Sequence, residues 1–111
     1  MEKQKLLFVC SQNKLRSLTA EKLFDKNPDF AVKSAGTEHN ARQKITAGMI
    51  GWADMIFVME RKHRDRLKQK FGGEIRDKTV ITLNIPDDYK FMQPELIEIL
   101  EKRLAEYIEF G

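Results

Sequence analysis

Short apolar runs alternate along the chain with stretches in which apolar residues recur every three to four positions. A continuous apolar run is typical of a β-strand that is covered on both faces, and the longer spacing is typical of an amphipathic helix. Two clear runs occupy residues 6–9 and 55–59, and two weaker runs occupy residues 30–34 and 79–83. We therefore predict four β-strands with helices between them.

The predicted helices lie between and after these strands. A first helix follows Arg16 and ends near residues 26–28, where an asparagine and a proline stop it. Thr46 caps a short second helix that runs to residue 52, and a charged third helix covers residues 60–70 until Phe-Gly-Gly ends it. Pro94 is the first residue of the last helix. The core-facing positions of that helix are Leu96, Ile97, Leu100, Leu104 and Ile108.

Strands that alternate with helices favour an α/β fold. We expect a small, doubly wound, four-stranded parallel sheet with right-handed crossovers and helices on both faces. With 111 residues and 41% hydrophobic content, residues 1–111 should form a single domain. Ligands of such sheets bind at the carboxyl ends of the strands. Cys10, the turn at residues 34–37 and the loop at residues 84–89 each follow a strand, so they should lie at the same edge.

The composition narrows the setting of the protein. A formal net charge of +3 is compatible with anionic substrates and gives no strong case for a nucleic acid or a membrane as partner. The single cysteine excludes an internal disulfide and favours a reducing, cytoplasmic location. The apolar run after Met1 is too short for a signal peptide or a membrane span. The sequence gives no indication of the oligomeric state.

The first predicted strand leads into a loop that carries candidate chemistry. Cys10 ends the strand, and Arg16 and Ser17 begin the following helix, a Cys-x5-Arg-Ser spacing. A strand–loop–helix unit directs backbone N–H groups and a helix N-terminus into one concavity, which is an anion site. A thiolate is the nucleophilic form of cysteine and is favoured in such surroundings. The arginine fork can hold two phosphate oxygens. The pattern predicts a phosphate-ester hydrolase that forms a phosphocysteine.

The spacing alone has a second interpretation, because the chain is rich in basic residues. Cys10 would then be a small buried residue at the end of a core strand, and Arg16 a solvated residue of the first helical turn. However, an arginine in the first turn opposes the helix macrodipole and needs a local reason. A bound anion would supply that reason.

The motifs extend beyond this loop and resemble one known family. Residues 34–37 read Ser-Ala-Gly-Thr, and residues 53–61 contain the predicted third strand and the residues that follow it. Residues 85–89 read Ile-Pro-Asp-Asp-Tyr. Together with Val9, Cys10, Asn13, Arg16 and Ser17, and with Ala20, Glu21 and Phe24 of the first helix, they resemble the low-molecular-weight protein tyrosine phosphatases. The resemblance implies a flavodoxin-like (phosphatase I) fold, no cofactor, and hydrolysis of phosphotyrosine or other aryl phosphates, carried on a protein or a small molecule.

The chain departs from the family pattern at several places. Leu18 replaces a proline, and Leu15 replaces the second cysteine of many members, so their vicinal disulfide cannot form. Asp88 replaces the proline beside the general acid. The connection between Thr37 and Ala53 is much shorter than in the family. These departures put substrate choice in doubt more than they do catalysis.

The resemblance also implies roles for individual residues. Cys10 would attack phosphorus, while Arg16 and the loop N–H groups bind the phosphoryl oxygens. The Ser17 hydroxyl would assist the thiolate, and Asn13 would either brace the loop or be a simple turn residue. The predicted substrate-binding residues are Ser11, Gln12, Asn13, Lys14, Leu15, Ser17 and Tyr89.

The loop at residues 84–89 carries the predicted general acid. Alignment with the family motif favours Asp87, and Asp88 is the alternative; both are also ordinary turn residues. Asp87 would protonate the leaving oxygen and then activate water. Tyr89 and Phe91 would either wall an aromatic substrate or pack against the last helix.

Other residues give weaker indications. His39 and His63 lack the partners of a metal site, so we expect none. Trp52 is more typical of a core residue than of a pocket wall. The basic run at residues 61–70 would suit an anionic partner but is more typical of a solvated helix face.

Two other functions remain open from the sequence. A phosphocysteine carrier of the sugar-transport type has a cysteine after its first strand, but it needs a long-lived intermediate, against which Arg16 and a nearby acid argue. A catalytically weak phosphoryl-binding module is the second alternative.

Overall fold

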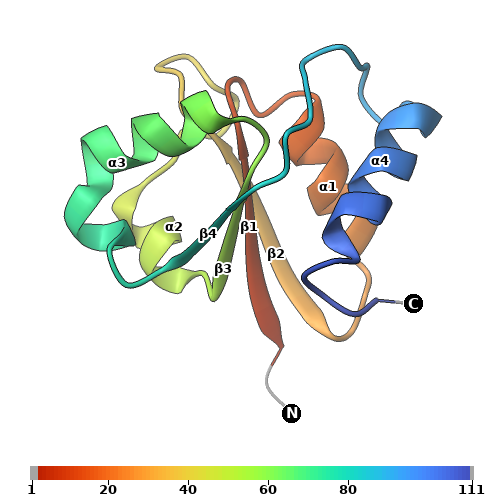
Figure 1. The fold of residues 1–111 in the computed structure, drawn as a ribbon, viewed down its shortest axis with the longest axis horizontal. Coiled ribbons are helices and arrows are strands. Elements are labelled where there is room, and N and C mark those ends of the chain that lie inside the picture. The colour runs from red at the N-terminus through yellow and green to blue at the C-terminus, as the bar shows by residue number, and fades with distance from the viewer. Residues whose placement is uncertain (1–2, 111) are drawn as a thin grey trace.

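The computed structural model describes residues 3–110 of the chain. Four strands and four helices alternate along it (Figure 1). The elements are β1 (Gln4–Cys10), α1 (Arg16–Phe24), β2 (Phe30–Gly36), α2 (Ala47–Trp52), β3 (Met55–Val58), α3 (Arg61–Ile75), β4 (Thr79–Thr82) and α4 (Pro94–Leu104). None of these helices is long and apolar enough to cross a membrane.

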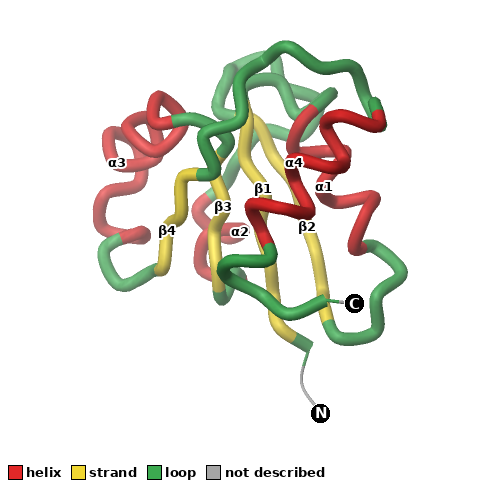
Figure 2. Tube along the Cα trace, turned by 45° about the vertical axis from the view of Figure 1, so that its right-hand side comes forward, coloured by secondary structure: helices red, strands yellow, loops and turns green. Residues whose placement is uncertain are grey.

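The strands form one parallel sheet in the order β2-β1-β3-β4, which confirms the predicted fold class. Helices α1 and α4 cover one face of the sheet, and α2 and α3 cover the other (Figures 1 and 2). The central position of β1 explains its continuous apolar run, because its side chains alternate between two hydrophobic cores. Leu6, Phe8 and Cys10 face α1 and α4, and Leu7 and Val9 face α2 and α3.

Most predicted boundaries hold to within a few residues. The Thr46 Oγ1 atom accepts a hydrogen bond from the Met49 N–H at 3.2 Å and caps α2, and Pro94 opens α4, both as predicted. β2 continues two residues beyond its predicted end, to Gly36, because its whole length pairs with β1. α1 ends earlier than predicted, at Phe24.

The end of α3 differs from the prediction. The backbone leaves helical geometry at Phe71, with φ −132° and ψ 34°, next to the two glycines that were expected to end the helix. It then resumes a helical course as far as Ile75, which is buried in the core between the sheet and helices α2 and α3. The buried Ile75 side chain gives this last turn a tertiary contact that local propensity does not show.

Candidate active site

The carboxyl edge of the sheet carries a cavity of about 180 Å³. Cys10 ends β1 there, and the residues up to Arg16 form a loop that leads into α1. The lining residues are Cys10, Ser11, Gln12, Lys14, Leu15, Arg16 and Asp87. Six of the seven therefore come from the loop predicted to bind an anion.

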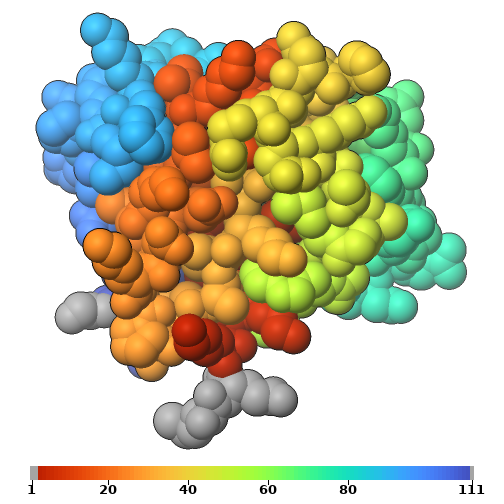
Figure 3. Space-filling model, turned by 180° about the vertical axis from the view of Figure 1, so that it is seen from behind, coloured from red at the N-terminus to blue at the C-terminus, as the bar shows by residue number. Residues whose placement is uncertain are grey.

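The segment at residues 37–42 holds the outer side of this loop. The two segments lie against each other at one end of the molecule (Figure 3). Four successive loop carbonyls accept hydrogen bonds from it: Cys10 O from Thr37 N (2.9 Å), Ser11 O from Glu38 N (3.0 Å), Gln12 O from Arg42 N (3.0 Å) and Asn13 O from Arg42 Nε (3.1 Å). In a trans peptide the C=O and the next N–H point in opposite directions. The carbonyls held outward thus turn the following N–H groups toward the cavity, as an anion-binding nest requires.

Two residues make this close approach possible. A Cβ atom on Gly36 would lie 2.5 Å from both the Ser11 carbonyl oxygen and the Ala41 Cβ, so any side chain there would displace the loop. Asn13 has a positive φ of 59°, which asparagine tolerates better than most residues. The Asn13 backbone N–H then points inward and lies 3.3 Å from the Cys10 Sγ.

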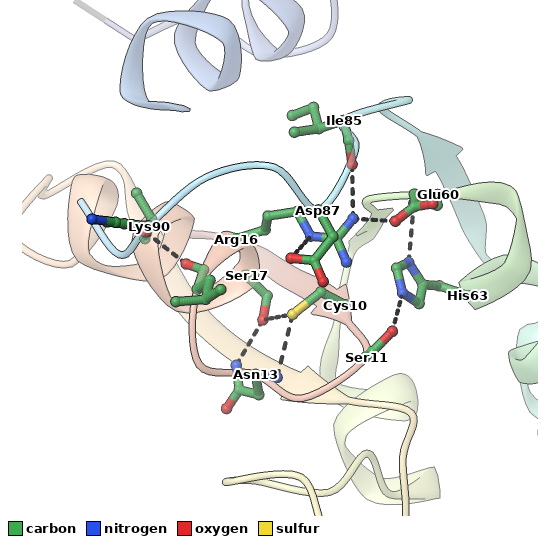
Figure 4. Close-up of polar contacts among 12 residues, drawn as sticks. Cys10, Ser11, Asn13, Arg16, Ser17, Glu60, His63, Ile85, Asp87 and Lys90 are labelled. Atoms are coloured by element: carbon green, nitrogen blue, oxygen red, sulfur yellow. Dashed lines mark hydrogen bonds and ion pairs between the residues drawn. The ribbon is translucent and has the colours of Figure 1, made fainter. Parts of the chain in front are cut away.

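The Cys10 sulfur receives a second polar contact. The Ser17 Oγ lies 3.0 Å from Sγ and itself accepts a hydrogen bond from Asn13 Nδ2 at 2.7 Å (Figure 4). The Ser17 hydroxyl hydrogen then has two acceptors within reach, the Ala35 carbonyl oxygen at 3.5 Å and the sulfur, which is nearer. Cys10 is only 3% exposed. The buried sulfur therefore has the Asn13 N–H and the Ser17 hydroxyl within hydrogen-bond distance.

Arg16 is buried between the ends of two other strands. Its Nη1 donates to the Glu60 carboxylate, just after β3, and to the Ile85 carbonyl oxygen at 2.8 Å, after β4 (Figure 4). The Asp87 Oδ1 lies 3.7 Å from Arg16 Nε. Glu60 gives Arg16 a protein partner that the sequence did not indicate. A guanidinium has five N–H donors, so others are left to bind an anion.

Glu60 and His63 form a second polar group beside the loop. The Glu60 backbone N–H donates to His63 Nδ1 at 3.0 Å, and His63 Nε2 lies 2.9 Å from the Ser11 Oγ. Burial is the main cause that lowers the pKa of His63 to about 4. The positive charge of Arg16 lowers this pKa further, and the negative charge of Glu60 opposes the shift. The pKa of Glu60 lies below its usual value. Partial burial raises this pKa, but the hydrogen bond and charge of Arg16 and the charge of Lys62 lower it by more.

The structure places the predicted site residues in three positions: at the cavity, behind the loop and, for Tyr89, away from the cavity. The catalytic candidates Cys10, Arg16 and Asp87 line the cavity, and so do four of the predicted substrate-binding residues: Ser11, Gln12, Lys14 and Leu15. Asn13 and Ser17 are fully buried behind the loop, where they contact the Cys10 sulfur instead.

Tyr89 is the predicted substrate-binding residue that the structure places elsewhere. Its side chain is half-buried and packs against the core that α1 and α4 cover. Tyr89 does not line the cavity, so the structure agrees with the alternative prediction that Tyr89 is a packing residue. Asp88 is exposed and does not line the cavity either. Trp52 packs against the other core, with the Lys33 Nζ 4.5 Å from its ring centroid.

The sequence reasoning did not identify Glu60 and His63 as site residues. Glu60 directly follows a buried strand, and the rule that strand ends share one edge could have indicated it. His63 was considered only as a metal ligand. Within residues 3–110, no group of three or more His, Cys, Asp or Glu side chains is placed to hold a metal ion.

The fold and the cysteine loop together define a class, and the chain has the fold of the low-molecular-weight protein tyrosine phosphatases. It is similar to Wzb of Vibrio vulnificus in complex with benzylphosphonate, with a TM-score of 0.75 and 21% identity over 96% of this chain and 97% of that one. It is also similar to SP-PTP, the low-molecular-weight protein tyrosine phosphatase of Streptococcus pyogenes, with a TM-score of 0.75 and 17% identity over 96% and 94% of the two chains.

A third similar structure is the YwlE arginine phosphatase of Geobacillus stearothermophilus, with a TM-score of 0.66 and 21% identity over 97% and 99% of the chains. No protein-family model and no curated protein sequence matches the chain. At these identities the structural likeness establishes the fold, and the chemistry rests on the residues of the site.

Proposed function

We propose that the protein is a phosphatase that hydrolyses phosphotyrosine or other aryl phosphate monoesters through a phosphocysteine. One observation carries the proposal. The buried Cys10 sulfur, with two polar contacts, lies at a cavity that the N–H groups of the loop, Arg16 and Asp87 share. A nucleophile, an anion-binding loop and an acid are the groups this reaction needs.

In the first step the Cys10 thiolate attacks phosphorus opposite the leaving oxygen. The S–P bond forms as the P–O bond to the leaving group breaks, and a protonated Asp87 transfers its proton to the departing oxygen. Arg16 and the inward N–H groups stabilise the charge on the three equatorial oxygens. The hydroxyl of Ser17 stabilises the sulfur before the attack.

In the second step water attacks the phosphocysteine. Asp87, now a carboxylate, accepts a proton from this water, the S–P bond breaks, and inorganic phosphate and the thiolate are released. The Asp87 side chain is 58% exposed, so solvent water reaches it directly. Ser17 is placed to stabilise the sulfur again as it leaves.

The similar structures support a phosphoryl ligand of this kind. Benzylphosphonate, bound to the Vibrio protein, has the shape of an aryl-type phosphate ester. Because an arginine phosphatase shares the fold, phosphoarginine belongs beside the aryl phosphates in a substrate test. The presence of Asp87 at the cavity favours hydrolysis over a phosphocysteine carrier, which needs its intermediate to persist.

The test is turnover of p-nitrophenyl phosphate, phosphotyrosine and phosphoarginine by the purified chain in excess chelator. We expect hydrolysis by the native protein and none by Cys10→Ser, which should still bind inorganic phosphate because the loop N–H groups and Arg16 remain. Thermal unfolding of both proteins controls for folding. Substantial turnover by the serine variant would exclude the covalent mechanism. Hydrolysis of phosphoarginine alone would overturn the aryl specificity, and a native protein that binds phosphate but hydrolyses none of the three would be a binding module.

A further inference from the structure

Ser11 is joined to a buried histidine at the edge of the cavity. Its Oγ lies 2.9 Å from His63 Nε2, and His63 is 1% exposed (Figure 4). On the other side of its ring, His63 Nδ1 is 3.0 Å from the Glu60 backbone nitrogen. The imidazole thus connects the first residue of the loop to the residue whose carboxylate holds Arg16.

These contacts determine which ring nitrogen carries the proton. A backbone N–H can only donate, so His63 Nδ1 must be the acceptor of the Glu60 hydrogen bond. In the neutral imidazole the hydrogen is then on Nε2. Nε2 therefore donates to the Ser11 Oγ, and Ser11 is the acceptor in that bond.

The assignment leaves the Ser11 hydroxyl hydrogen without an acceptor among the residues that the structure describes. A serine hydroxyl has one donor hydrogen and two lone pairs, and His63 occupies one lone pair. Among residues 3–110, His63 is the hydrogen-bond partner found for this side chain. Ser11 lines the cavity directly beside Cys10. An anion in the cavity is the acceptor that such a hydroxyl fits.

We propose that the Ser11 hydroxyl donates to a phosphoryl oxygen of the bound substrate, and that His63 is the positioning residue that directs this hydrogen into the cavity. The inference deepens the proposed phosphatase function and rests on it for the identity of the ligand. It adds a side-chain donor to the backbone N–H groups of the loop.

The electrostatics of His63 agree with this role. Burial is the main cause of its low pKa of about 4, so the ring stays neutral at neutral pH. A proton on Nδ1 would face the Glu60 N–H and break the bond that orients the ring. Arg16 and Lys62 oppose that proton, whereas the Glu60 carboxylate favours it.

Two substitutions at His63 separate the two ring contacts. The amide oxygen of His63→Asn replaces the Nδ1 acceptor for Glu60 but removes the donor to Ser11. The amide NH₂ of His63→Gln replaces the Nε2 donor and removes the Nδ1 acceptor. Ser11→Ala removes the hydroxyl, and Ser11→Thr keeps it. His39→Asn is the matched control, because it makes the same chemical change at an exposed histidine.

The first measurement is inorganic phosphate binding by calorimetry on the full chain, and the second is kcat and KM for p-nitrophenyl phosphate. We expect Ser11→Ala and His63→Asn each to weaken phosphate binding by about tenfold or more, the usual effect of losing a hydrogen bond to a charged group. The double variant should bind no more weakly than either single variant. Ser11→Thr should recover much of the affinity that Ser11→Ala loses, and His63→Gln should lose less affinity than His63→Asn. His39→Asn, outside the site, should bind phosphate as the native chain does.

Several results would overturn the inference. These are native phosphate affinity in Ser11→Ala, additive losses in the double variant, or a loss in His63→Gln as large as in His63→Asn. The Ser11 variants keep the test valid even if a His63 variant fails to fold, because Ser11 is a partly exposed loop residue. If the native chain binds phosphate but hydrolyses no ester, the proposed function fails while the binding data still decide the role of Ser11.

Discussion

Acidification should destabilise the folded protein through His63. The pKa of this buried imidazole is about 4 in the folded chain, below the ordinary value of 6.5. Between these two values the unfolded chain binds a proton at His63 that the folded chain does not. The contribution to the free energy of unfolding is therefore fully present above pH 6.5 and is lost as the pH falls toward 4.

The size of the effect follows from the two pKa values. Each pKa unit corresponds to about 1.4 kcal/mol, so the full loss across the window is about 3 kcal/mol. Between pH 7.5 and pH 5 the same linkage relation gives a loss of about 2 kcal/mol. Arg16, on α1, and Lys62 oppose the proton, and the Glu60 carboxylate favours it. A loss of this size is a sizeable share of the stability of a small domain.

Urea unfolding at several pH values between 4.5 and 7.5 measures the effect. Carboxylates also titrate in this range, so the informative quantity is the difference between the native chain and His63→Gln, whose side chain cannot take up the proton. We expect the stability advantage of the native chain over the variant to shrink by about 2 kcal/mol from pH 7.5 to pH 5. A flat difference, or one that grows on acidification, would refute the reasoning, and His39→Asn should follow the native curve.

Three further substitutions test the proposed roles in catalysis. Arg16→Lys should lower kcat/KM by about a hundredfold or more despite its conserved charge, because an ammonium lacks the planar fork of a guanidinium. Near-native kinetics in this variant would show that Arg16 has no role in catalysis. Asp87→Asn should slow phenyl phosphate by ~10²–10⁴-fold and nitrophenyl phosphate far less, since a poor leaving group depends most on the acid. Asp88→Asn should change neither much, and the reverse pattern across a leaving-group series would assign the acid to Asp88.

The fold was predictable because its strongest signals are local. The run of β1 is apolar at every position since both faces of the strand are buried, and such a run indicates a central strand without any knowledge of its neighbours. The loop after Cys10 was predictable for the same reason, because its residues are contiguous. Parallel pairing then brings the ends of the other strands to the same edge.

The strand-end rule could have placed Glu60 at the edge that holds the site, but the hydrogen bonds of Arg16 and Ser11 were not predictable. These bonds depend on how far side chains reach across the sheet. Glu60 is 44 residues from Arg16 in sequence and His63 is 52 residues from Ser11, so no spacing motif joins them. The position of Tyr89 escaped prediction for a different reason. Asn84 and Met92, on either side of it, have positive φ values of 57° and 58°, and in irregular backbone the alternation of side chains gives no direction.

The register of the sheet sets the geometry of the site. The Met59 N–H donates to the Val9 carbonyl at 3.0 Å, and the Ile85 N–H donates to the Met59 carbonyl at 2.8 Å, so the hydrogen-bond ladder continues past the ends of β3 and β4. The residue after Val9 is Cys10, the proposed nucleophile, and the residue after Met59 is Glu60. The Ile85 carbonyl accepts a hydrogen bond from Arg16.

A slip of one residue between β1 and β3 would turn Glu60 away from Arg16 and exchange the two core faces of the strand. Both cores oppose such a slip, because Phe8 packs between Phe24 and Phe57, with ring centroids 6.1 and 5.6 Å apart, on one face, and Leu7 and Val9 are fully buried on the other. The packing that makes β1 a strand therefore also holds Cys10 and Arg16 at the same cavity. Asp87 lies outside this packing, on the loop after β4, so we expect changes in that loop to alter substrate choice while the proposed nucleophile and Arg16 stay in place.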